Sequence, residues 1–267
     1  MIPNLLIAAA LLLGQQVKKD PGQPPVEELF VTEEVYPQEK GEVEVVLGSM
    51  FHKDGSQKTK HIPLAVEYGI GGSWQVEAQW DGYTNLTPFI GPSAHSVGNL
   101  TVGVKRSFMN MRNSDIHSAV GFTVGAPFGS VNQGFNDGLM EYLPNVILAR
   151  DLPQWKNIHV ITQAGIDFVQ RIKSPSNQTP VPAAHKFEWN SGFLVPYDRL
   201  RFVVEYNWLT NTWNHGGQDN QKYVTPGIVW DLPSVWEFSV GSAIGVNHGA
   251  EKFRVMARVI YQFTIAK

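Results

Sequence analysis

The chain has 267 residues, and 21 Lys and Arg against 24 Asp and Glu give it a formal net charge of −3. This balance excludes the strongly basic surface that is typical of nucleic-acid-binding proteins. Cysteine is absent, which excludes a disulfide framework, a thiolate metal site and a cysteine nucleophile.

The first predicted element is an apolar stretch over residues 5–14 (LLIAAALLLG), which is followed by Gln15 and Gln16. This pattern is typical of the hydrophobic region of a secretory signal peptide, so we predict a signal peptide over residues 1–19. The apolar run is shorter than the roughly 18 residues that a membrane-spanning helix needs. Residues 20–40 are rich in Pro and Glu and predict a periplasmic tether or a plug segment.

Residues 41–267 predict one transmembrane β-barrel domain. Apolar residues alternate with polar or small ones over segments of about ten residues, which is the period of a strand with two different faces. In the last segment Val255 and Val259 share one face, and Arg254 and Arg258 share the other. Twelve such segments occur, near residues 41–52, 60–71, 74–83, 96–108, 114–127, 139–151, 156–171, 185–196, 199–211, 221–231, 234–247 and 251–264. A single-chain bacterial barrel requires an even number of strands.

The connections between these segments alternate between short and long, as in an up-and-down barrel. The short ones lie at 71–73, 109–113, 152–155, 197–198 and 232–233, and the longer ones at 53–59, 81–95, 127–138, 173–184 and 212–220. In an outer-membrane barrel with periplasmic termini, short turns face the periplasm and longer loops face outward. Residues 248–250 are the exception, because this connection is short where a long one is expected. We predict a bacterial outer-membrane location with periplasmic termini.

The polarity of the two strand faces separates a membrane barrel from a soluble sheet. A small soluble barrel fills its interior with apolar side chains, whereas here the face opposite the apolar one carries charged or amide residues on nearly every strand. Twelve strands also exceed the roughly eight whose interior side chains can fill a barrel. The predicted fold class is therefore all-β: a transmembrane, antiparallel, up-and-down β-barrel of about twelve strands, preceded by a signal peptide and a short N-terminal tether.

The positions of the aromatic residues also indicate a membrane barrel, because Trp and Tyr favour the two membrane interfaces. One predicted belt, at the short-turn end, contains Tyr68, Trp74, Trp155, Tyr197, Trp230, Trp236, Tyr261 and Phe263. The other, toward the loop end, contains Phe51, Trp80, Tyr142, Phe168, Trp189, Tyr206 and Trp208. Arg106 and Arg150 also have lipid-facing parity, near the short-turn ends of their strands, where a long cationic side chain can reach the interface.

A family resemblance follows from several segments of the chain. They are VTEEVYPQEKGEVEVVLG, HIPLAVEYGIGGSWQVEAQW, GNLTVGVKRSF, AVGFTVGAPFGS, PNVILARDLPQWKNIHVITQAG and YVTPGIVWDL. Over roughly residues 30–263 the chain resembles the family of outer-membrane transporters named for the MetA pathway of phenol degradation. The resemblance implies a bacterial outer-membrane barrel, inserted by the barrel-assembly machinery and found in contexts of aromatic-compound metabolism. It carries over no functional residues.

The interior face of the barrel is the only functional surface that the sequence marks. Its charged residues and histidines are the candidate lumen-lining residues: Glu67, Glu77, Lys105, His117, His159, Asp167, Arg171, Glu188, Arg201, Glu205, Glu237, Arg254 and Arg258. Charge rings and constrictions set selectivity in channels. A small excess of acidic residues on this face argues against an anion porin.

The function predicted from these observations is a passive outer-membrane channel or transporter for small molecules, aromatic or apolar ones among them. Outer-membrane lipid and an unidentified small solute are its predicted partners, with no cofactor and no nucleic acid, and the oligomeric state stays open. The alternative is a non-transporting barrel that stabilises the envelope or binds a surface component through its loops. In a further possibility, residues 27–40 plug the periplasmic mouth.

A lipid-modifying enzyme of the outer membrane is a more distant alternative, because outer-membrane phospholipases have a similar number of strands. Their Ser and His pair lies on the lipid-facing surface near the outer interface. His185 is the histidine with lipid-facing parity at the outer start of a strand, and no motif marks a serine partner for it. We therefore predict that the protein is not an enzyme and that it has no catalytic, cofactor-binding or metal-binding residues.

Overall fold

The computed structural model describes residues 29–54, 57–87, 93–133, 135–155, 157–176, 183–210, 220–232 and 235–265. The predicted signal peptide and the first part of the predicted tether lie outside the described residues. In the described part of the chain, no helix is long and apolar enough to cross a membrane.

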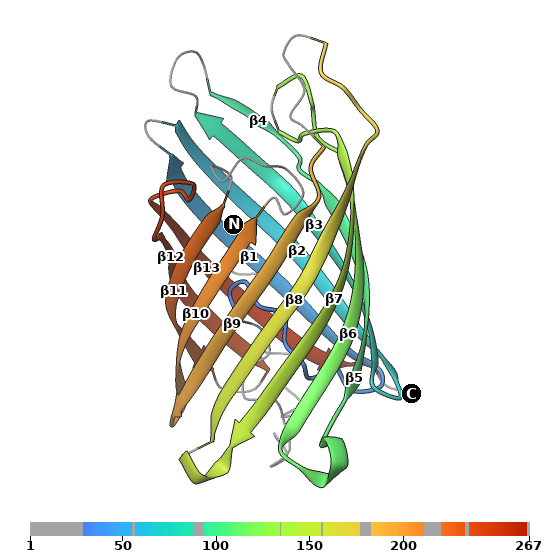
Figure 1. The fold of residues 1–267 in the computed structure, drawn as a ribbon, viewed down its shortest axis with the longest axis vertical. Coiled ribbons are helices and arrows are strands. Elements are labelled where there is room, and N and C mark those ends of the chain that lie inside the picture. Colours follow the sequence, from blue (N-terminus) through green and yellow to red (C-terminus); the bar gives the residue numbers. More distant parts are fainter. Residues whose placement is uncertain are drawn as a thin grey trace, which may run out of the picture.

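The described residues form one antiparallel sheet with two short 3₁₀ turns (Figure 1). Its strands are β1 (Glu42–Asp54), β2 (Gln57–Gly71), β3 (Trp74–Thr87), β4 (Ala94–Ser96), β5 (Leu100–Phe108), β6 (Ile116–Ala126), β7 (Leu139–Leu152), β8 (Ile158–Arg171), β9 (Lys186–Tyr197), β10 (Leu200–Thr210), β11 (Gln221–Asp231), β12 (Trp236–Gly245) and β13 (Phe253–Thr264). The turns are η1 (Met111–Asn113), before β6, and η2 (Pro153–Trp155), before β8.

The sheet closes on itself because the first strand pairs with the last. β1 and β13 are antiparallel neighbours over their whole length, from Glu42 opposite Thr264 to Lys53 opposite Phe253. β4 and β5 both pair with β3, so they are two pieces of one wall strand, and the barrel wall has twelve strands. Closure leaves no sheet edge with unsatisfied backbone groups, which is what a strand-built membrane protein requires. The predicted all-β, antiparallel, up-and-down barrel of twelve strands is confirmed.

The two ends of the barrel differ in their connections. At one end lie the short connections that precede β3, β6, β8, β10 and β12, together with the start of β1 and the end of β13. We call this the turn end and the opposite one the loop end; in Figure 1 the turn end is at the bottom.

Side chains alternate between the two faces of the wall as predicted. Outward-facing apolar residues such as Leu47, Val120 and Val146 are about half exposed, since no part of the described chain covers them. Inward-facing polar residues such as Glu44 and Thr225 are fully buried. An apolar exterior around a polar interior is the arrangement of a barrel in lipid.

The structure corrects three details at the loop end. β3 continues to Thr87, so the connection predicted over 81–95 is partly strand. The connection predicted as a long loop at 53–59 is mostly strand, because β1 and β2 continue their pairing to Asp54 opposite Gln57. The wall strand predicted as continuous over 96–108 is interrupted at 97–99. There the backbone N–H of Gly98 donates to the carbonyl of Asp81 at 2.6 Å, and a Cβ on Gly98 would overlap the Asp81 side chain. This close approach bends the strand and splits it into β4 and β5.

Residues 29–41, which we call the inner segment, lie within the barrel as the irregular blue stretch in Figure 1. The side chains of Leu29, Phe30 and Val35 are buried and pack into a cluster of inward-facing apolar wall residues. The wall members are Ala119, Ile147, Ala149, Ile161, Leu194, Val203, Tyr223, Val229, Ala243 and Met256. The interior is therefore not uniformly polar: part of the inner wall is apolar and packs against this segment.

Candidate functional site

The inner segment has no regular secondary structure, so its backbone groups need partners from the wall. Glu205 of β10, whose exposed fraction is 0%, supplies the acceptors for three successive N–H groups. Its carboxylate accepts hydrogen bonds from Phe30 N at 3.1 Å, Val31 N at 3.2 Å and Thr32 N at 2.8 Å. One buried carboxylate thus fixes the start of the segment to the middle of a wall strand.

Cationic and hydroxyl side chains hold the carbonyl groups of the segment. Lys105 Nζ donates to the carbonyl of Glu34 at 2.7 Å, and Ser107 Oγ donates to the next carbonyl along the segment at 2.6 Å. The Arg258 guanidinium donates to the carbonyl of Phe30 at 2.6 Å and to the carbonyl before it. Hydrogen bonds from charged donors are stronger than those between neutral groups. Wall side chains therefore bind both N–H and carbonyl groups of the segment backbone.

Tyr36 joins the segment to a cluster of ionisable residues near the turn end. Its hydroxyl donates to Asp151 Oδ2 at 2.6 Å, and His117 and His159 contact the same carboxylate at 3.0 and 2.7 Å. His159 Nε2 also lies 3.6 Å from a carboxylate oxygen of Glu34. Burial, and then the hydrogen bond to Asp151, raise the pKa of the Tyr36 phenol above its ordinary value. The phenol therefore stays protonated and remains a donor at neutral pH.

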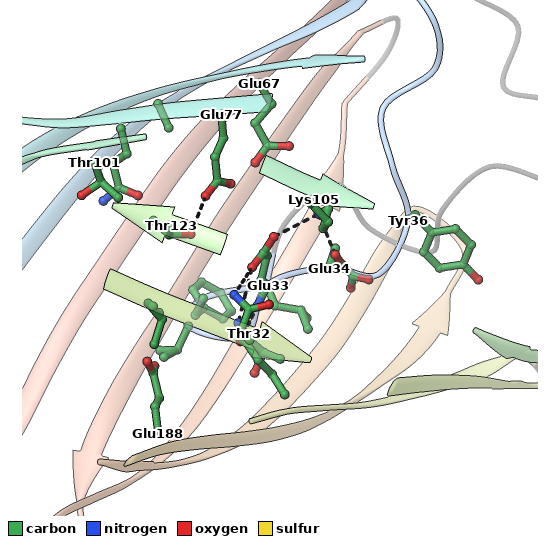
Figure 2. Close-up of a pocket in the computed structure, with 18 of the residues that line it drawn as sticks. Thr32, Glu33, Glu34, Tyr36, Glu67, Glu77, Thr101, Lys105, Thr123 and Glu188 are labelled. Carbon is green, nitrogen blue, oxygen red and sulfur yellow. Dashed lines mark hydrogen bonds and ion pairs between the residues drawn. The ribbon is translucent and has the colours of Figure 1, made fainter. Parts of the chain in front are cut away.

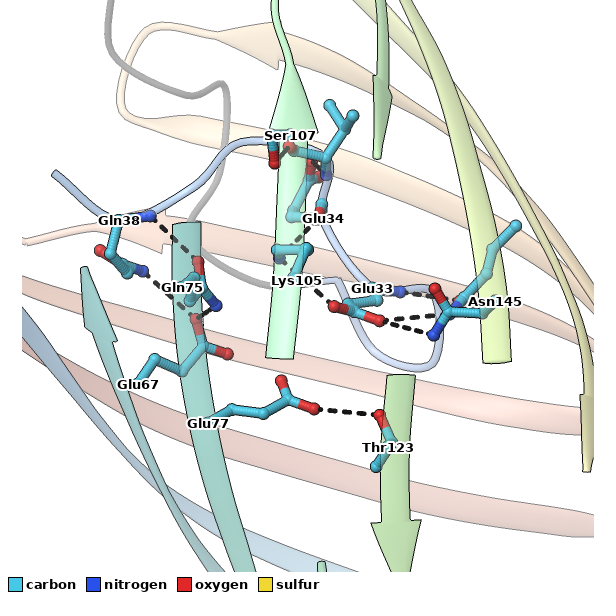
Figure 3. A network of polar contacts seen from close by, with 12 residues as sticks. Glu33, Glu34, Gln38, Glu67, Gln75, Glu77, Lys105, Ser107, Thr123 and Asn145 are labelled. Carbon is cyan, nitrogen blue, oxygen red and sulfur yellow. Dashed lines mark hydrogen bonds and ion pairs between the residues drawn. The ribbon is translucent and has the colours of Figure 1, made fainter. Parts of the chain in front are cut away.

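A network of amides and carboxylates surrounds the end of the segment near β1 (Figure 3). The backbone N–H of Gln38 donates to Gln75 Oε1 at 3.0 Å, and its side-chain amide donates to Glu44 at 3.0 Å. Glu67 accepts hydrogen bonds from both Gln38 and Gln75. Gln262 of β13 donates to Gln38 Oε1 at 3.0 Å, so three wall regions converge on one residue of the segment.

A cavity of about 240 Å³ remains between the inner segment and the wall (Figure 2). Five carboxylates and two cationic side chains line it: Glu33, Glu34, Glu67, Glu77, Glu188, Lys105 and Arg258. Two of them form an ion pair, Lys105 Nζ and Glu33 Oε1 at 3.4 Å. Leu29, Phe30, Val31 and Leu143 give the cavity an apolar side. The lining is thus acidic and partly apolar.

The candidate residues from the sequence all point to the interior but fall into separate groups. Those that contact the inner segment are Glu67, Lys105, His159, Glu205 and Arg258. Glu77 and Glu188 line the cavity, and His117 contacts Asp151 beside Tyr36. The others make contacts elsewhere in the barrel: Asp167 with Lys186, Arg171 with the carbonyls of Asp137 and Lys173, Arg201 with Glu237, and Arg254 with Glu251. They do not form one continuous ring.

Several residues that hold the segment were not among the candidates. Tyr36, Gln75, Ser107, Asp151 and Gln163 each bond to it or belong to it. Gln75, Ser107, Asp151 and Gln163 lie on the interior face of their strands, and this position is the signal that could have identified them.

His185, the histidine considered for lipid hydrolysis, has structural contacts. Its Nδ1 accepts a hydrogen bond from the backbone N–H of Val169 at 3.0 Å, and its ring packs against Phe168. Among the described residues, no group of three or more His, Asp and Glu is arranged to hold a metal ion.

Comparisons with known proteins connect this geometry to one class of fold. Solved structures of outer-membrane channels superpose on most of the chain at low sequence identity. The COG4313 outer-membrane channel from Pseudomonas putida F1 gives a TM-score of 0.60 at 12% identity, covering 92% of this chain and 100% of that one. The NanC porin gives 0.57 at 10% identity over 83% and 100% of the two chains, and the KdgM porin gives 0.55 at 9% identity over 84% and 99%.

No family model and no curated protein matches the chain. At these identities the structural likeness establishes the fold: a closed barrel of the kind found in outer-membrane channels and porins.

Proposed function

We propose that the protein is a passive outer-membrane channel for small solutes, with its turn end and both termini in the periplasm. The observation that carries the proposal is the closed twelve-stranded barrel with an apolar exterior and a charged interior cavity. Such an exterior is unstable in water and stable in lipid, and a polar interior is typical of barrels that enclose a water-filled channel or a plug. The fold shared with known channels supports the same function.

The inner segment sets the conducting state in this proposal. Wall residues hold it at its start, its middle and its end, through Glu205, Lys105 and Gln75. While it is held, the space beside it is a cavity of about 240 Å³. We infer that the described arrangement is a restricted state and that displacement of the segment widens the path.

Planar-bilayer conductance tests this function directly. We expect the full chain to give small current steps, and a variant that lacks residues 29–40 to give larger ones, because removal of the segment widens the space between the walls. Heat-modifiable migration in gel electrophoresis verifies that each variant is folded. A folded deletion variant that carries no current and admits no solute into liposomes would contradict the proposal.

The filled interior favours one alternative, a barrel that does not transport. In it the inner segment, with buried Phe30 and Val35, serves as a core that stabilises the wall. Deleting residues 29–40 would then lower the thermal stability of the barrel without creating a conducting pore. The two functions therefore predict different results for the same variant.

The class of solute follows from the lining of the cavity and from the family resemblance. Five carboxylates against two cationic groups favour cations and neutral molecules over anions. The apolar side formed by Leu29, Phe30 and Leu143 suits solutes with an apolar or aromatic body. Membership in the MetA-pathway family, which we propose on the sequence resemblance, points to the same solutes. Liposome swelling with matched cationic, neutral and anionic aromatic compounds would rank them.

A further inference from the structure

The outer wall of the barrel is hollowed by an apolar groove of about 760 Å³ across β7, β8, β9 and β10. It begins near the turn end beside Arg150 and Trp155 and reaches toward the middle of the wall at Ser191 and Tyr206. The strand register explains the hollow. Leu148 lies opposite Thr162, Thr162 opposite Ser191, and Ser191 opposite Tyr206, so two small side chains sit between two large ones.

The polar atoms at the floor of the groove are satisfied by one another. Thr162 Oγ1 lies 2.8 Å from Ser191 Oγ, and it accepts a hydrogen bond from Trp189 Nε1 at 2.9 Å. The hydroxyl groups therefore need no water or ligand, and the surface they leave is apolar. An extended hydrocarbon chain can fill this surface, and a volume of this size lies within the range of ordinary ligand pockets, about 300–1,000 Å³.

A cationic side chain lies at the turn-end rim of the groove. Arg150 is exposed on the outer surface, and its guanidinium has no hydrogen bond, ion pair or aromatic partner among the described residues. Arg106 has the same lipid-facing parity near the turn end, but its guanidinium lies over the rings of Trp74 and Phe108 at 5.2 and 5.1 Å. Both arginines face outward; Arg106 packs on aromatic rings, whereas Arg150 has no such partner among the described residues.

We propose that this groove is a binding site for a glycerophospholipid, with one acyl chain along Thr162 and Ser191 and the phosphate at the Arg150 guanidinium. A guanidinium binds a phosphate through two parallel hydrogen bonds. The arginine and the apolar groove together therefore match a ligand that has both a phosphate and a hydrocarbon chain. The site rests on the proposed location, because the turn end then lies in the phospholipid-containing leaflet. It is separate from the lumen and does not depend on conduction.

Native mass spectrometry of the full chain tests the site. The protein is purified in detergent, depleted of lipid and incubated with palmitoyl-oleoyl phosphatidylglycerol, and the fraction that retains one lipid is measured. We expect Arg150→Gln to weaken retention by about tenfold, as loss of a charge-assisted contact would. Ser191→Leu fills the groove and should weaken retention with Arg150 intact. Arg106→Gln is the matched control and should retain lipid like the unmodified chain.

Two further arms separate the sources of binding. Diacylglycerol with the same acyl chains should be retained less than the phospholipid, and inorganic phosphate should not displace the phospholipid. Equal losses in Arg150→Gln and Arg106→Gln, or full retention in a folded Ser191→Leu, would overturn the proposal. Conductance of Arg150→Gln should equal that of the unmodified chain. A chain that retains lipid but does not conduct would therefore contradict the channel function and support the lipid site. A chain that conducts but does not retain lipid would contradict the lipid site and support the channel function.

Discussion

Glu205 fixes the start of the inner segment to the wall. It is fully buried and accepts hydrogen bonds from three backbone N–H groups, and each bond to a charged acceptor contributes about 1.5–3 kcal/mol. We expect Glu205→Ala to shift the equilibrium toward the displaced segment by about 2–3 kcal/mol, or about 30- to 160-fold in open probability while the displaced state is the minor one. Single-channel recording measures this shift. Glu237→Gln is the control, because Glu237 is equally buried but pairs with Arg201.

Tyr36 supplies a second contact whose strength depends on pH. The pKa of its phenol is raised in the folded protein, so the contribution of Tyr36 to stability is complete below the ordinary phenol pKa of about 10 and is lost as the pH rises above it. The groups around the phenol are Asp151, His117, His159 and Glu34.

The expected result is that open probability rises above pH 10 in the unmodified chain. Tyr36→Phe should conduct more than the unmodified chain at pH 7, because a hydrogen bond to a charged acceptor is lost, and it should lack the part of the alkaline rise that belongs to the phenol. Current recordings between pH 7 and 11 check both points. An identical alkaline rise in the two proteins would assign it to another group.

At the scale of elements, the wall strands are shaped to fit the inner segment. The Phe30 ring lies against Gly227 of β11 and Gly241 of β12, and a Cβ at Gly227 would overlap that ring. Overpacking of a filled interior costs about 1–3 kcal/mol. Gly227→Ala should therefore displace the segment and raise conductance, and Phe30→Ala should suppress its effect. Gly125→Ala serves as the control. The atom nearest to a Cβ added at Gly125 is a Glu141 oxygen at 3.3 Å, which belongs to the wall and not to the segment.

The same elements show what the sequence could predict. The wall strands were predicted at nearly their observed places, because lipid outside and water or polar groups inside impose a period of two on every spanning strand. The split between β4 and β5 could not be predicted, since it arises from the approach of Gly98 to Asp81 on another strand. Local periodicity carries no information about such a contact.

The site was predicted only in part, for a related reason. Parity places Glu205 and Lys105 on the interior face, but it does not identify their partners. Glu205 and Thr32 are separated by 173 positions in the chain, and their contact depends on barrel closure and on the path of a segment without periodicity. A Glu-rich stretch before the first strand indicated a plug as one possibility. Only the three-dimensional structure specifies which wall residues bind residues 29–41.

For the whole molecule, the charge of the interior matters more than the net charge of the chain. The formal net charge is only −3, yet carboxylates outnumber cationic groups five to two around the cavity. Charges in a narrow, low-dielectric passage act strongly on permeating ions, and their effect falls as salt screens them. The barrel should therefore select cations at low salt and lose part of this selectivity at high salt.

Reversal potentials across a KCl gradient test the selectivity. Glu77→Gln combined with Glu188→Gln removes two negative charges from the cavity while nearly preserving the shape of the side chains, so the potential should move toward that of a non-selective pore. Glu237→Gln is again the control, because it removes a buried carboxylate that does not line the cavity. If the double variant and the control shift the potential equally, selectivity comes from the barrel as a whole. If only the double variant shifts it, the permeating ions pass through the space beside the inner segment.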